Sequence, residues 1–197
     1  MRLAQQATTP ARKLFGNVTK ALIPALLGVL AVTAVPSSAQ AQDLFSFRAK
    51  LGVQFPSDSD VRNHVDTPLF AAELDYDLPS LTAGKTRISL GYIERRSSGN
   101  GFRAIPLTVS RIFSPPNPAA DITGSVYFGA GGGLYFLRRT GGGSDEQTTV
   151  GIFAVAGYDF PRTLGFIDFV EAKYHLVSGG ANGLSPNGLV LMLGKRF

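Results

Sequence analysis

The chain contains no cysteine and no tryptophan, and only two histidines and two methionines among its 197 residues. The absence of cysteine excludes disulfide bonds and thiol catalysis. Two histidines without any thiol ligand argue against a metal centre. We therefore expect no metal or other cofactor, and the stability must come from the fold itself.

A long apolar run is also missing, apart from one short stretch near the N-terminus. Residues 1–41 contain four basic residues and no acidic one, followed by the 15 apolar or small residues Ala21–Val35 and then Ala39-Gln40-Ala41. A basic start, a short apolar segment and an A-x-A site are the parts of a secretory signal peptide. Fifteen residues are short for a helix that must cross about 30 Å of hydrocarbon. We predict a signal peptide over 1–41, cleaved after Ala41, and a mature domain over 42–197.

Most of the excess positive charge of the chain lies in the predicted signal peptide. The whole chain has 19 basic and 14 acidic residues, a formal net charge of +5. Four of the basic residues lie in 1–41, so the mature chain has 15 basic against 14 acidic residues, or +1. This balance gives no electrostatic reason to expect a nucleic acid as partner.

The mature sequence lacks a helical period of useful length and instead alternates polar and apolar residues with a period of two. This period is typical of β-strands. Ser57–Asp60, Ser97–Gly101, Pro115–Pro118, Gly141–Ser144 and Gly179–Gly183 supply turn residues between the strands. We predict eight strands, over residues 45–54, 70–77, 87–92, 104–110, 126–136, 151–159, 170–176 and 188–197.

The two faces of these strands predict which side is inside. The polar face also carries small residues such as Gly52, Gly91 and Gly131, which suit the narrow lumen of an eight-stranded barrel. The other face is almost free of charge. A charge costs about 2–4 kcal/mol at the bilayer midplane but only about 0–1 at the interface. The few charges on the apolar face lie near predicted strand ends: Glu94, Arg103, Arg111, Asp168 and Lys195.

These observations predict an all-β fold, an eight-stranded antiparallel up-and-down transmembrane β-barrel with its apolar face towards lipid. An even strand count places both termini on the periplasmic side. The predicted outer loops are then 55–68, 97–101, 138–149 and 177–187, and the predicted periplasmic turns are 78–86, 113–124 and 160–165.

Charged residues on the predicted inward face form the best candidate for a site. An acidic second strand lies between basic first and third strands, which should set Lys50 opposite Glu73, Arg48 opposite Asp75, and Asp77 opposite Arg87. Unpaired charges in a narrow lumen would cost several kcal/mol each. We interpret the set as an ion-pair plug rather than a path for water or small ions, formed by Arg48, Lys50, Glu73, Asp75, Asp77, Arg87, Arg95, Asp159, Glu171, Lys173 and Arg196.

Several short segments resemble a known family. They are Ile105–Val109, Tyr127–Tyr135, Glu171–Tyr174, Asn187–Leu189 and the terminal Lys195-Arg196-Phe197. Together they resemble the small outer-membrane β-barrel domain family, whose relatives include opacity-type proteins and the barrels of outer membrane proteins A and W. In that family the terminal aromatic is read by the barrel-assembly machinery, and Phe197 matches it. Lys195 departs from the usual signal.

Two motifs that suggest catalysis or phosphate binding do not have the spacing or the setting that these activities require. His175 and Ser178 resemble the His/Ser pair of outer-membrane lipid A deacylases, but a spacing of three places them on opposite faces of a strand. The Gly129–Gly133 run lies inside a strand and not between a strand and a helix, so it does not predict a phosphate-binding loop. We therefore predict that the protein is not an enzyme.

Three functions remain open from the sequence. The first is a non-enzymatic outer-membrane barrel with a structural or surface-contact role, contacting outer-membrane lipid, with Val61–Val65 and Arg138–Thr149 its most distinctive outer stretches. The second is a narrow transport protein for small solutes or apolar molecules. The third is a soluble periplasmic lipocalin-like carrier with the barrel inverted. The residues do not identify a surface partner.

Overall fold

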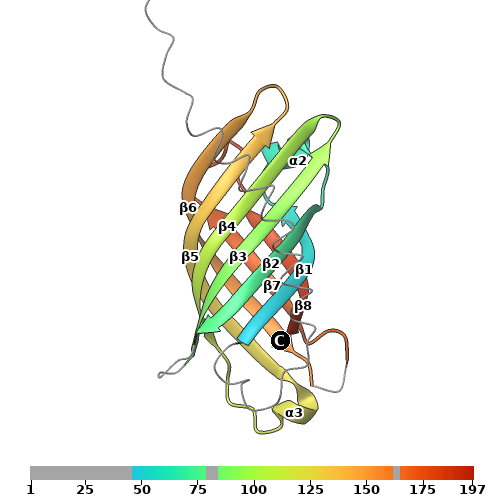
Figure 1. The fold of residues 1–197 in the computed structure, drawn as a ribbon, viewed down its shortest axis with the longest axis vertical. Helices are drawn as coiled ribbons and strands as arrows, with labels where there is room; N and C mark the ends of the chain where they lie inside the picture. Colours follow the sequence, from blue (N-terminus) through green and yellow to red (C-terminus); the bar gives the residue numbers. More distant parts are fainter. Residues whose placement is uncertain (1–45, 79–83, 162–164) are drawn as a thin grey trace, which may run out of the picture. The chain divides into compact units, whose positions relative to one another are not determined.

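The computed structural model describes residues 46–78, 84–161 and 165–197 and folds them into a closed antiparallel β-barrel (Figure 1). The strands pair in chain order, and β8 pairs with β1 to close the barrel. The predicted eight-stranded up-and-down barrel is confirmed; the predicted signal peptide over 1–41, with Ala39 and Ala41, lies outside the described residues. The strands are β1 (Ser46–Pro56), β2 (Leu69–Leu78), β3 (Lys85–Ser97), β4 (Asn100–Phe113), β5 (Ser125–Thr140), β6 (Asp145–Asp159), β7 (Phe169–Val177) and β8 (Gly188–Arg196).

Two short helices interrupt segments that the sequence predicts as loops. Helix α2 (Ser59–His64) follows β1, and its first turn is capped by the Asp58 carboxylate, which accepts a hydrogen bond from the Asp60 backbone N–H at 2.9 Å. Helix α3 (Ala120–Thr123) lies between β4 and β5. Neither described helix has the length or the apolar run that crossing a membrane as a helix requires.

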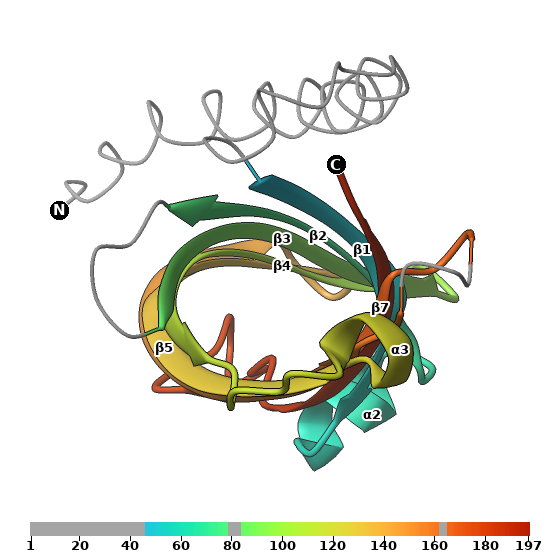
Figure 2. The same cartoon turned by 90° about the horizontal axis from the view of Figure 1, so that it is seen from below.

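The two ends of the barrel differ. Phe197 donates its backbone N–H to the Phe47 carbonyl at 2.9 Å, so the start of β1 and the end of β8 meet at one end. Helix α3 lies at this end and α2 lies at the opposite end (Figure 1), and Figure 2 looks along the barrel from the end with α3. We call the end with α3 and the C-terminus the inner end, and the end with α2 the outer end.

The outward face of the strands is apolar, as the alternation predicts. On β4, Leu107 and Val109 are 43% and 51% exposed, whereas their neighbours Thr108 and Ser110 are buried. The same alternation continues around the barrel. Large exposed apolar side chains include Leu51, Phe70, Ile88, Val126, Phe128, Leu134, Ile152, Leu176, Leu191 and Leu193.

The β5–β6 hairpin is longer than predicted. Its strands remain paired as far as Arg139 and Asp145, so the predicted outer loop 138–149 is mostly strand around a short turn. Gly141, Gly142 and Gly143 all have positive φ there, which glycine adopts without strain. The turn residues were correctly located, but the alternation continues beyond the predicted strand ends. Strand β7 ends at Val177, opposite Gly151, so β6 extends past it at the outer end.

Candidate functional site: the barrel lumen

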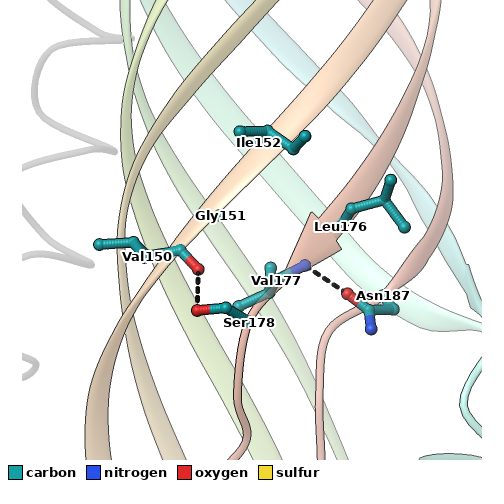
Figure 3. A pocket seen from close by; sticks show the side chains of 7 residues that line it. All are labelled: Val150, Gly151, Ile152, Leu176, Val177, Ser178 and Asn187. Carbon is teal, nitrogen blue, oxygen red and sulfur yellow. Dashed lines mark hydrogen bonds between the residues drawn. The ribbon is translucent and has the colours of Figure 1, made fainter.

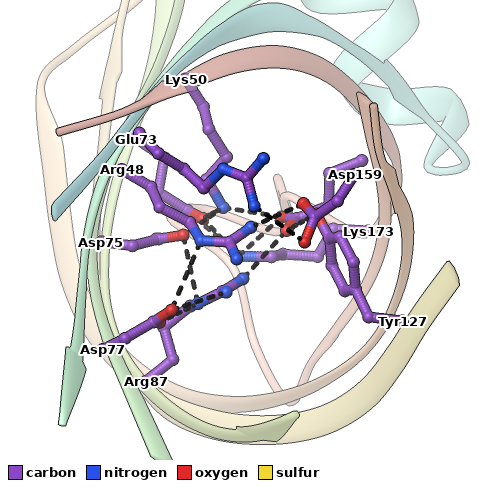
Figure 4. Close-up of polar contacts among 11 residues, drawn as sticks. Arg48, Lys50, Glu73, Asp75, Asp77, Arg87, Tyr127, Asp159 and Lys173 are labelled. Atoms are coloured by element: carbon purple, nitrogen blue, oxygen red, sulfur yellow. Dashed lines mark hydrogen bonds and ion pairs between the residues drawn. The ribbon is translucent and has the colours of Figure 1, made fainter. Parts of the chain in front are cut away.

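The lumen contains an ion-pair cluster in its inner half. Figure 4 shows these side chains pointing from different strands towards the middle of the barrel. Five cations and five carboxylates take part, so the cluster has no net formal charge. Its members are Arg48, Lys50, Glu73, Asp75, Asp77, Arg87, Asp159, Glu171, Lys173 and Arg196.

Lys50 connects three of the carboxylates. Its Nζ lies 2.8 Å from Asp75 Oδ2 and 2.6 Å from Glu171 Oε1. It also pairs with Glu73, which the β1–β2 register sets directly opposite it. Lys50 is only 2% exposed. The predicted pairing of Lys50 with Glu73 is therefore present, within a larger network than one cross-strand pair.

Arg87 is a second connection in the ion-pair cluster. Its Nε lies 2.6 Å from Asp77 Oδ1, the partner that the β2–β3 register predicts. Its Nη1 lies 3.2 Å from Glu171 Oε2. Lys173 completes the centre, with Nζ 2.6 Å from Glu73 Oε1. Because every buried charge here contacts an opposite charge, the desolvation of each is offset by its partners.

Arg48 does not pair with the carboxylate predicted for it. The strand register sets Arg48 opposite Asp75, as expected. Its guanidinium instead lies 3.4 Å from Asp77 and 3.3 Å from Asp159, because Lys50 and Arg87 already contact Asp75. Arg196 also contacts Asp159, at 3.3 Å, and its side chain is 32% exposed at the inner mouth.

Arg95 lies outside the ion-pair cluster, contrary to the sequence prediction. It follows the inward phase of β3, but it lies opposite Phe102 near the outer end and is exposed. The alternation indicates the face of a residue and not its height in the barrel. Arg87 of β3 therefore lies in the inner half of the lumen, whereas Arg95 of the same strand lies closer to the outer end.

Aromatic rings cover part of the ion-pair cluster. Tyr127 donates its hydroxyl to Glu171 Oε2 at 2.9 Å, and the Arg48 guanidinium lies 5.4 Å from the Tyr127 ring centre. Lys173 Nζ lies 4.6 Å from the Phe153 ring centre. These distances are within the range of cation–π attraction. A smaller buried apolar cluster, Ile112, Tyr127, Phe153 and Val155, lines the β4–β6 wall.

The outer half of the lumen is filled differently, by an apolar layer that the sequence analysis missed. Two of its members, Val61 and Val65, come from α2 and the residue after it and are almost fully buried. Val61 and Val65 are therefore part of the core, whereas Arg62 and Asn63 between them are exposed. The apolar layer comprises Val61, Val65, Leu69, Ala71, Ile93, Phe102, Ala104, Tyr135, Leu137, Val177, Ala181, Leu184, Val190 and Met192.

His175 lies between the ion-pair cluster and the apolar layer. Its Nδ1 is 2.7 Å from the Tyr135 hydroxyl, and both residues are buried. Tyr135 packs closely over Gly151 of β6, where a Cβ atom would lie 2.7 Å from the ring. Ser178 lies on the opposite face, as predicted, and its hydroxyl donates to the Val150 carbonyl at 3.0 Å. His175 and Ser178 therefore form no catalytic pair.

An apolar groove of about 400 Å³ lies on the outside of the barrel, where β6 extends past β7 (Figure 3). Its lining side chains Val150, Ile152 and Leu176 are at least half exposed. The groove is thus part of the outward apolar face and not an opening into the lumen. Among the described residues, no group of three or more histidines and carboxylates could hold a metal ion.

No family model and no curated protein sequence matches this chain. A solved structure does: the crystal structure of Neisserial surface protein A (NspA) is similar over 77% of this chain and 95% of that chain. The TM-score is 0.54 and the sequence identity is 17%. The comparison supports the small outer-membrane β-barrel resemblance at the level of the fold, whereas the likeness to opacity-type proteins and to outer membrane proteins A and W stays a prediction. The chain is thus similar in fold to a small surface protein.

Proposed function

We propose that the protein is an integral outer-membrane β-barrel with a non-enzymatic, structural or surface-contact role. The observation that carries this proposal is its reversed polarity, with Leu, Val, Phe and Ile outside and paired charges inside. A water-soluble carrier would need polar residues on its outward positions. A barrel surrounded by acyl chains needs the arrangement seen here.

The heights of the outward charges support the same proposal. Arg103 pairs with Glu94 at 3.0 Å near the outer end of β3 and β4. Lys195 lies 3.8 Å from Asp168 near the inner end. Charges at these levels would lie close to the membrane interfaces, where their cost is about 0–1 kcal/mol.

We further propose that the lumen is closed to solutes. The ion-pair cluster fills its inner half, and the apolar layer with α2 fills its outer half. This arrangement supports a structural or surface role more than the alternative of narrow transport. The similar solved structure is named as a surface protein, which supports exposure of the outer loops at the cell surface.

Export and assembly complete the proposal. The N-terminal segment 1–41 would direct the chain across the inner membrane. Phe197, the last residue of the sequence, would then be read by the barrel-assembly machinery, as in the family that the sequence resembles. Lys195, which departs from the usual signal, points outward and donates to the Gly165 carbonyl at 3.0 Å.

Membrane insertion is tested by fractionation. Mature protein should stay in the membrane pellet after carbonate washing and be released only by detergent. Leu191→Arg, at an outward position of β8, should prevent assembly, because it places a charge in the apolar belt. Ser144→Arg, at the exposed tip of the β5–β6 hairpin, is the matched control and should assemble normally. Release of wild-type protein without detergent would refute the proposal.

Closure is tested separately in planar bilayers. The purified barrel should add no stable conductance steps. Large, stable steps from wild-type protein would favour the transport alternative while leaving membrane insertion intact.

A further inference from the structure

Two arginines lie directly opposite each other on the outward face, near the outer end. The β4–β5 register pairs Arg103 with Arg138. Directly opposed residues have Cβ atoms about 4.5–5.5 Å apart, and like charges at such positions are destabilising. Both have the same phase as the outward residues below them, since the next outward pairs are Ile105 with Phe136 and Leu107 with Leu134. The arginine pair thus lies at the outer end of a row of apolar cross-strand pairs, which we call the apolar ladder.

Each arginine of this pair has a carboxylate on the strand that lies away from the other arginine. Glu94 of β3 lies opposite Arg103, and Glu146 of β6 lies opposite Arg138. Glu94 is shared, because Arg96 Nε donates to its Oε1 at 2.9 Å and Arg103 Nη2 donates to the same atom at 3.0 Å. Its other oxygen accepts from Tyr92. Three guanidinium groups therefore share two carboxylates, and neither carboxylate lies between Arg103 and Arg138.

Two of the three side chains are accessible to a ligand. The Arg138 side chain is 35% exposed, although its Nε is buried and lies 3.5 Å from Glu146 without a hydrogen bond to a described residue. The Arg96 side chain is 70% exposed. Arg103 is held in place, with its guanidinium 5.8 Å from the Tyr92 ring centre. Guanidinium groups bind phosphate oxygens through paired, charge-assisted hydrogen bonds.

We propose that Arg96, Arg103 and Arg138, the arginine row, bind the phosphate groups of lipid A, the phosphorylated glycolipid of the outer leaflet. This inference rests on the proposed function, which places the outer end at the outer leaflet. A phosphate bridging Arg103 and Arg138 supplies the missing negative charge, while the acyl chains lie along the apolar ladder below. The row spans β3 to β5 only, so it forms one local site and not a ring around the barrel.

The test measures lipid binding to the purified, folded barrel in a zwitterionic detergent by native mass spectrometry. The lipids are bisphosphorylated lipid A, the same lipid without its phosphates, and phosphatidylglycerol. Wild-type protein should bind the phosphorylated lipid A at least about tenfold more tightly than either other lipid. Lipid A without its phosphates cannot form the charge-assisted hydrogen bonds, and phosphatidylglycerol lacks a second phosphate. Equal binding of phosphatidylglycerol would overturn the proposal in favour of a generic anionic surface.

Variants locate the site. Arg103→Gln with Arg138→Gln should weaken lipid A binding by at least about tenfold. The control exchanges two outward cations near the inner end, Arg111→Gln with Lys195→Gln, and should bind as wild type. Unchanged binding in the first variant, or an equal loss in the control, would overturn the proposal. If the double variant does not fold, the exposed Arg96→Gln replaces it, with a smaller but measurable loss expected. A folded, membrane-embedded barrel that fails these tests leaves the proposed function standing.

Discussion

The inner and outer halves of the lumen are enclosed by the same eight strands, but they are filled by different chemistry. Along the inward phase of β2, the residues change from Asp77, Asp75 and Glu73 to Ala71 and Leu69. Along β7, they change from Glu171 and Lys173 to His175 and Val177. The same change thus occurs on two strands that are not neighbours, since β8 and β1 lie between β7 and β2. The charged half depends on balanced partners, whereas the apolar half depends on filled volume, so the two should respond differently to the same kind of substitution.

The largest expected effect is in the charged half. Lys50→Met removes the cation shared by Glu73, Asp75 and Glu171 and leaves the ion-pair cluster with an excess negative charge. Removing one partner of a buried ion pair costs about 3–5 kcal/mol. We expect a loss of this size in the free energy of unfolding, measured by denaturant titration in lipid vesicles. Lys195→Met, on the exposed Asp168 pair, should lose less than about 1 kcal/mol.

Restoring the charge balance should recover part of that loss. Lys50 Nζ lies 2.6 Å from Glu171 Oε1, so Glu171→Gln removes a negative charge next to the lost cation. The double variant Lys50→Met, Glu171→Gln should be destabilised by less than the sum of the single variants, with a coupling of about 0.5–3 kcal/mol. Strict additivity in the same titrations would mean that charge balance does not control this half.

In the apolar half, the loss should follow the volume removed. Leu69 is fully buried in the apolar layer, and Leu69→Ala should cost about 2–5 kcal/mol. The matched control is Leu191→Ala, an outward position, where acyl chains can fill the space and the loss should be smaller. Equal losses from the two variants in vesicle unfolding would contradict the assignment of inside and outside.

The boundary between the halves should give the smallest effect. Tyr135→Phe removes the hydroxyl that lies 2.7 Å from His175 Nδ1 but keeps the ring over Gly151. A neutral hydrogen bond of this kind contributes about 0.5–1.5 kcal/mol. We expect a loss in that range by the same titration. Loss of folding would instead show that His175 and Tyr135 hold the two halves together.

The sequence predicted the strands, the faces and much of the register, because a period of two is a local property. It correctly predicted that Lys50 would lie opposite Glu73 and Asp77 opposite Arg87. It could not give the partners of Arg48, because long side chains reach across the lumen to Asp159 of β6, which is 111 residues away. It also misplaced Arg95, since alternation does not encode height.

The apolar layer escaped prediction for a related reason. Phe102 and Leu137 have the inward phase, but they lie just beyond the predicted ends of their strands. Val61 reaches the lumen only because α2 folds over the outer end. An inward run of apolar residues at the loop ends of several strands is the signal that could have revealed this layer.

Thiol accessibility at two adjacent positions of β4 tests the sealed lumen and the lipid-facing surface together. The chain has no cysteine, so Val109→Cys and Ser110→Cys each introduce one thiol, the first outward and the second in the lumen. In vesicles, neither thiol should react with a water-soluble maleimide. The control Ser144→Cys, at the exposed hairpin tip, should react fully. A fluorophore attached at position 109 before folding should be quenched by brominated lipid. Rapid reaction at position 110 would show a lumen open to water, and rapid reaction without quenching at position 109 would show that the apolar face does not contact lipid.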